Sequence, residues 1–173
     1  MAAKVHEIEQ RASKFSKQLE ETIPASGQRR IPRNSVENFK ARREFARQLM
    51  AEVRQLEPTK EQAVDVCRKF QALKTELEDG LILIKARYGG DPCLKELSTI
   101  IRSTIKLYDD LLIDLKVLLD AFEGRPPAEI RLTLGKTWEQ LLDHILLYHE
   151  IKAREGESGG EITLREIEEK YGL

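Results

Sequence analysis

The chain has 173 residues and a formal net charge of −1, with 40% hydrophobic, 34% charged and 6% aromatic residues. A net charge this close to zero gives the protein no overall electrostatic attraction for nucleic acid or a membrane. A charged partner would therefore have to bind a local charged patch. No stretch approaches the roughly 18 apolar residues of a membrane span, no apolar signal region opens the chain, and the two cysteines lack metal-type spacing. These features favour a cytoplasmic protein with free thiols.

Residues 1–22 predict an amphipathic helical arm. Their apolar residues recur every three or four positions and form one narrow stripe, which includes Val5, Ile8, Phe15 and Leu19. One interpretation is a surface helix that lies on the rest of the protein. The other is an arm that pairs with another chain, because a narrow stripe suits a coiled-coil seam. Under the second interpretation, these four residues form a candidate partner-binding site.

A loop is predicted over residues 23–35, where two prolines and a glycine interrupt the helical pattern. Positive charge gathers in this loop and in the helix that follows, at Arg29, Arg30, Arg33, Lys40, Arg42, Arg43 and Arg47. Arginine forks suit phosphate or the carboxylates of an acidic protein, so this segment is a candidate anion- or acidic-partner-binding site. The alternative is a solvated face that pairs with acidic residues of the same chain. The register of Val36 and Phe39 places Arg43 on the apolar face.

The strongest helical pattern runs from Leu94 to Phe122, where apolar or near-apolar residues alternate at spacings of three and four without a slip. The rows on both flanks are apolar too, and this width indicates a helix in contact with two or more neighbours. We call this helix the spine. Asp114 interrupts one flanking row, and we expect it to form an ion pair with an arginine or lysine of a neighbouring helix.

Three further helices are predicted around the spine, over residues 36–57, 60–88 and 137–154. In the last of them, the residues expected to face inward are Trp138, Leu141, Leu142, Ile145 and Tyr148. We therefore predict an all-α fold, an antiparallel bundle of about four long helices over residues 36–154. The arm precedes this bundle, and a short C-terminal helix follows it.

Cap residues mark where these helices begin. Ser35 is the expected N-cap of the first helix, and Thr59 forms a capping box with Gln62 at the start of the second. A short Gly-Gly-Asp-Pro connection then ends the second helix, with Asp91 as the N-cap of the spine and Pro92 in its first turn. A connection this short forces the two helices into an antiparallel hairpin.

Residues 155–160 predict a flexible linker, and residues 161–173 predict a short acidic helix with Thr163 and Glu166 as its capping box. This last segment resembles the first helix of a helix-turn-helix motif, in its "T-L-x-E-I" start and its "Y-G-L" end. The resemblance implies DNA binding only together with a recognition helix, which the segment itself does not contain. Glu168 departs from the motif, which usually has a small residue at that position.

No catalytic, metal-binding or cofactor-binding residue is predicted. His144 and His149 are five positions apart, so they point about 140° away from each other on a helix and cannot share a metal ion. Asp114 is a single carboxylate without a second acid or a histidine beside it in the pattern, so it forms no acid–base pair.

We therefore expect a non-enzymatic helical bundle that acts through a protein partner or through self-association of its helix faces, as a subunit, adaptor or assembly factor. The alternative is a nucleic-acid-associated subunit whose Arg29–Arg47 segment neutralises backbone phosphates. No membrane, small-molecule substrate or cofactor is expected. The salt dependence of binding separates the two functions, because phosphate contacts weaken steeply with added salt.

Overall fold

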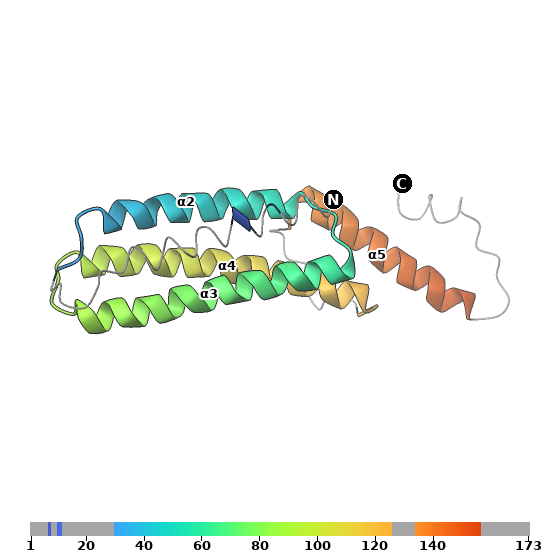
Figure 1. Cartoon of the computed structure of the whole chain (residues 1–173). Coiled ribbons are helices and arrows are strands. Elements are labelled where there is room, and N and C mark those ends of the chain that lie inside the picture. The colour runs from blue at the N-terminus through green and yellow to red at the C-terminus, as the bar shows by residue number, and fades with distance from the viewer. Residues whose placement is uncertain (1–6, 8–9, 12–29, 126–133, 157–173) are drawn as a thin grey trace.

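The computed structural model describes residues 7, 10–11, 30–125 and 134–156. Within these residues the chain forms four long helices and no strand (Figure 1). Their bounds are Ser35–Arg54 for α2, Lys60–Arg87 for α3, Leu94–Phe122 for α4 and Lys136–Glu155 for α5. The prediction of an all-α bundle is confirmed. Most of the arm and of the linker, and all of the predicted acidic C-terminal helix, lie outside the described residues.

The predicted spine is α4. The helices α2, α3 and α5 each pack against it, and α2 runs parallel to α4 whereas α3 runs antiparallel to both (Figure 1). Leu111, Leu115 and Leu118 of α4 are fully buried, and the burial of each such side chain contributes about 1.5–3 kcal/mol. The unbroken apolar pattern of the sequence is thus the inner face of the helix that holds the bundle together.

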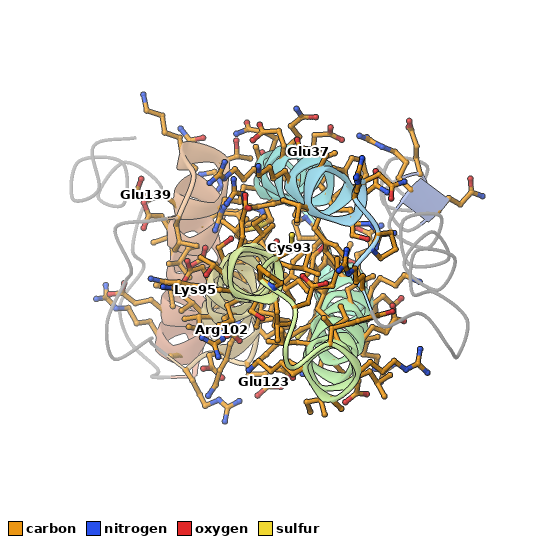
Figure 2. The ribbon with its side chains drawn as sticks, turned by 90° about the vertical axis from the view of Figure 1, so that its left-hand side faces the viewer. Glu37, Cys93, Lys95, Arg102, Glu123 and Glu139 are labelled. Carbon is orange, nitrogen blue, oxygen red and sulfur yellow. The ribbon has the colours of Figure 1, made fainter. Side chains whose placement is uncertain are left out.

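The direction of α5 differs from that of the other helices. It begins beside the C-terminal end of α2, crosses α4 obliquely and extends past the end of the other three helices (Figure 1). Viewed along the bundle, α5 lies on one side of α4 and α3 lies on the other (Figure 2). The buried residues of α5 are Trp138, Leu142 and Ile145, so the helix contributes to the core only through its first half.

Polar contacts at two places fasten α5 to the rest of the bundle, and the first place includes a hydrogen bond from Thr137 Oγ1 to Gln55 Oε1 at 3.1 Å. Near its start, Trp138 Nε1 donates a buried hydrogen bond to the carbonyl oxygen of Leu56, at 2.9 Å. Farther along, His149 Nε2 lies 3.0 Å from the carbonyl oxygen of Phe122. The last carbonyls of a helix have no partner within it, so the tautomer of His149 with its proton on Nε2 satisfies one of them at the end of α4.

The spine ends at Phe122, the last residue of its predicted apolar pattern. Gly124 follows with a φ of +73°, the left-handed conformation in which glycine commonly ends a helix. A Cβ atom at this position would lie 3.2 Å from Nδ1 of His149. The glycine therefore serves two purposes, because it makes the turn and it leaves room for the histidine that joins α5 to α4.

The capping box at the start of α3 is confirmed. Gln62 N donates to Thr59 Oγ1 at 3.3 Å, and Thr59 N donates to Gln62 Oε1 at 3.0 Å. At the start of α2 the prediction of Ser35 as the N-cap is wrong, because Asn34 precedes the helix and Ser35 is its first residue. The N–H group of Ser35 donates to the Pro32 carbonyl at 2.9 Å, which closes a turn that draws Ser35 into the helix.

The connection between α3 and α4 forms the predicted hairpin, but Asp91 has a different part in it. α4 begins at Leu94 with Cys93 before it, so Asp91 and Pro92 precede the helix rather than capping and opening it. Asp91 Oδ2 accepts a hydrogen bond from Ile31 N at 2.9 Å, and Oδ1 accepts one from Cys93 N at 2.8 Å. These two N–H groups, Ile31 first, hold the pKa of Asp91 below its usual value.

We expect Leu115→Ala to lower the free energy of unfolding by about 2–5 kcal/mol, because it leaves a cavity where α4 meets its neighbours. The matched control is Ile113→Ala on the exposed side of the same helix, which we expect to cost about 1 kcal/mol or less. Urea titration followed by circular dichroism measures both. Equal losses in the two variants would contradict the orientation of α4.

We expect Asp91→Asn to lower the melting temperature at neutral pH, because an amide cannot accept both backbone hydrogen bonds through its two polar atoms. The folded-state pKa of Asp91 lies below the ordinary 3.8, so the stabilisation is complete above that pH and is lost as the pH falls through the folded-state pKa. Melting curves from about pH 7 to about pH 3 should therefore show the gap between the parent and the variant narrowing in acid.

The control for this experiment is Asp79→Asn, at an exposed position of α3. Its melting temperature should follow that of the parent chain across the whole range. A gap for Asp91→Asn that stays constant in acid would show that the charge of Asp91 does not stabilise the hairpin.

Candidate partner-binding surfaces

One residue of the predicted arm is placed against the bundle. Arg11 Nη1 and Nη2 donate to Glu52 Oε2 and Oε1 at 2.6 and 3.3 Å, and the guanidinium carbon lies 5.3 Å from the centroid of the Phe45 ring. Such ion-pair and cation–π contacts fit the surface-helix interpretation at Arg11. The candidate partner-binding residues of the arm all lie outside the described residues, and their role stays a prediction for Val5, Ile8, Phe15 and Leu19.

The N-terminal part of the predicted basic segment lies ahead of α2. Arg29 is outside the described residues, whereas Arg30 and Arg33 are exposed. The charge of Arg30 adds a small contribution to the lowered pKa of Asp91, behind the two backbone hydrogen bonds. These two arginines are exposed members of the segment for which no ion pair is seen within the described residues.

Acidic residues of the same chain neutralise two further members of the segment. Lys40 Nζ lies 2.9 Å from a carboxylate oxygen of Glu37 and 3.1 Å from one of Glu96. Hydrogen bonds to Glu37 and then to Glu96 raise the pKa of Lys40 above its usual value. Arg47 lies 3.2 Å from Glu44, one turn away on α2. The alternative of a solvated, internally paired face therefore describes these positions.

Arg42, rather than Arg43, lies on the buried face of α2. It is 9% exposed, and its guanidinium carbon lies 5.3 Å from the centroid of the Phe39 ring. Burial lowers the pKa of Arg42 to about 10, and the nearby Tyr108 opposes this shift. Burial also raises the pKa of Tyr108 to about 12.

The prediction that placed Arg43 on the apolar face is wrong by one residue, which on a helix is a rotation of about 100°. The buried positions of α2 repeat from Ser35, through Phe39, to Arg42. Arg43 is half-buried, and its Nε atom is buried without a hydrogen-bond partner. The basic segment is thus distributed around α2 and does not form one positive surface in the described part of the chain.

The expected ion pair of Asp114 is confirmed. Its partner is Arg54 of α2, whose Nη2 and Nε atoms donate to Asp114 Oδ2 at 2.7 and 3.3 Å. The Asp114 side chain is 0% exposed and that of Arg54 is 18% exposed. Asp114 Oδ1 is buried without a hydrogen-bond partner. The pair joins the end of α2 to the spine, so this interior carboxylate has a structural role.

Reactive side chains are scattered in the described part of the chain, where no group of three or more histidine, cysteine or acidic residues could hold a metal ion. His144 is exposed, while His149 lies against the end of α4. Burial raises the pKa of the Cys67 thiol, which keeps it protonated and unreactive. Cys93 is free and exposed at the hairpin.

The sequence prediction also erred on α5, where Tyr148 is 56% exposed rather than buried. The ring of Tyr148 has two neighbours on the same helix, Lys152, whose Nζ lies 6.0 Å from the ring centroid, and His149, whose ring centroid lies 5.5 Å away. Leu147 and Ile151 are half-buried. Ile151 follows Leu147 by four positions and Tyr148 by three, so the three side chains share one face of the helix. We call Leu147, Tyr148 and Ile151 the α5 face.

Comparison with known proteins places the chain in no group, because no family model, no curated protein and no solved structure matches it. Among the described residues, no helix has the length and apolar content that crossing a bilayer requires. The surfaces of the bundle are therefore the features from which its function has to be argued.

We expect Arg54→Met to lower the free energy of unfolding by about 3–5 kcal/mol, because it leaves the buried Asp114 carboxylate without its cation. The double variant Arg54→Met/Asp114→Leu should recover most of this loss, since it removes both charges. Arg47→Met, which breaks an exposed ion pair of the same helix, is the matched control and should cost about 1 kcal/mol or less. Urea titration at neutral pH measures all three, and an Arg54→Met loss no larger than the control would contradict a structural role for the pair.

Proposed function

We propose that this protein is a non-enzymatic helical bundle that acts by binding another protein, as a subunit, adaptor or assembly factor. The observation that carries the proposal is the α5 face. It is an apolar face in the second half of α5, and it includes a large aromatic side chain that is mostly exposed.

The surroundings of the α5 face favour a protein partner. The charged residues at this end of α5 pair with one another, Lys152 with Glu155 at 2.8 Å and Arg154 with Glu150 at 2.6 Å. The charged side chains of this end are therefore paired within the helix, whereas more than half of Tyr148 stays exposed beside Lys152, whose Nζ lies 6.0 Å from the ring centroid. An amphipathic helix that lies in a groove of its partner is a common mode of protein recognition, and tyrosine is enriched among the residues that dominate such contacts.

The competing function, a nucleic-acid-associated subunit, depends on the basic segment of residues 29–47. In the described part of that segment, Lys40 and Arg47 pair with glutamates and Arg42 is buried. A phosphate backbone would need several of these side chains free on one surface. The geometry therefore supports protein binding better than phosphate binding.

We expect Tyr148→Glu to abolish the capture of a protein partner, because it places a charge on the α5 face. The matched control is Ala153→Glu, which adds the same charge at an exposed position on another side of the same helix end. Full-length parent and variant chains are used as baits in extracts of the cells that express the protein, and the captured proteins are quantified by mass spectrometry. Circular dichroism melting checks that both variants remain folded.

A protein retained by the parent chain and Ala153→Glu but lost with Tyr148→Glu supports the proposal. The same capture by all three chains would remove the α5 face from the interaction. Mass measurement of the purified chain shows whether that partner is a second copy. Binding of a DNA or RNA duplex at low salt, lost steeply as salt is added, would support the competing function instead.

A further inference from the structure

The outward side of the spine carries a row of cations. Lys95, Arg102, Lys106 and Lys116 are all exposed on α4, and none of them forms an ion pair within the described part of the chain. Their spacings of seven, four and ten residues keep them within about a quarter turn of one another along about 31 Å of helix. Figure 2 shows Lys95 and Arg102 on the side of α4 away from α2 and α3, which is also the side on which α5 lies. We call these four residues the α4 row.

Three of the five acids of α4 pair with neighbouring helices, and a fourth, Asp120, pairs with Arg125 at 3.1 Å. Glu96 pairs with Lys40 of α2 at 3.1 Å, and Asp109 pairs with Lys74 of α3 at 2.5 Å. Asp114 is buried with Arg54, as described above. The chain as a whole has a net charge of −1, yet the outward side of its central helix is locally positive.

An apolar side chain lies within the row. Ile113 is 37% exposed, and it stands between Lys106 and Lys116 on the same side of α4. A phosphate backbone offers nothing for an isoleucine to bury. A helix of another protein, with acidic residues along one side and an apolar residue among them, matches both the cations and the isoleucine. The row therefore favours a protein over a nucleic acid as its partner.

We propose that the α4 row binds an acidic amphipathic helix of a partner protein, which lies along α4 and covers Ile113. This proposal rests on the proposed protein-binding function and names a second contact surface for it, separate from the α5 face. The row supplies attraction along its length and fixes the register of the partner. Ile113 supplies the apolar contact at one end of the row.

The test uses two synthetic helical peptides and the purified full-length chain. In the first peptide, glutamates lie along one side at the spacings of the α4 row, with a leucine opposite Ile113; it is made in both chain directions. The second peptide has the same composition with its glutamates distributed around the helix. Fluorescence anisotropy measures the affinity of each peptide, and a DNA duplex of about the same length is titrated in parallel.

We expect the patterned peptide, in one of its two directions, to bind about tenfold tighter than the distributed one and to weaken with added salt. Arg102→Glu should weaken it by about tenfold. The matched control is Arg68→Glu, which makes the same change at an exposed arginine on α3, paired only with Asp65 at 3.8 Å. It should leave the affinity unchanged, and Ile113→Ser should weaken the patterned peptide by several-fold.

Equal affinity for the two peptides, or equal losses in Arg102→Glu and Arg68→Glu, would overturn the proposal. Tighter binding of the duplex than of the patterned peptide would overturn it in favour of a nucleic acid. A gain of about tenfold on removal of residues 157–173 would show that the chain's own acidic segment occupies the row, which also overturns it. Because these titrations need only the purified chain, they are decided independently of the capture experiment with Tyr148→Glu.

Discussion

The bundle depends on α4 being buried on several sides at once. The principal contacts of α2, α3 and α5 are with α4, so removal of this one inner face would leave the other helices without a shared core. A helix in that position must be apolar over more than one stripe, which explains the leucine-rich sequence of α4 and its fully buried Leu111 and Leu115. Its neighbours face the core on one side only, and they carry the narrower stripes of ordinary amphipathic helices.

Apolar contacts of this kind hold helices together but do not strongly select how far one helix is displaced along another, because leucines pack well in several registers. The polar contacts make that selection. Exposed pairs such as Lys74 with Asp109 contribute about 1 kcal/mol or less. The Arg54–Asp114 pair has a greater effect on register, since any displacement would leave a carboxylate with no exposed surface without its cation.

The sequence was sufficient for the parts of the fold that depend on local chemistry. The helix over Leu94–Phe122 and the capping box at Thr59 follow from periodicity and from backbone preferences, which neighbouring residues determine. The pairing of Asp114 with a basic residue also followed from pattern, because a single acid in an apolar row needs a cation when it is buried.

The remaining features depend on contacts between distant segments, which periodicity does not encode. The Ile31 N–H that binds Asp91 comes from 60 residues earlier in the chain. The sequence register placed Arg43 on the buried face of α2, whereas the structure places Arg42 there, one residue earlier. The exposure of Tyr148 follows from the oblique direction of α5, and the α4 row becomes apparent only when Glu96 and Asp109 of α4 are seen to pair with other helices.

The attachment of α5 has a mechanical consequence. The helix is held at two places, where Trp138 bonds to the segment that follows α2 and where His149 bonds to the end of α4, and two supports define the direction of a rod. Residues 150–155 continue that rod for about 9 Å beyond the second support, at about 1.5 Å per residue. Because both attachments resist a change in the direction of α5, the bundle holds a partner bound at the free end at a fixed distance and angle.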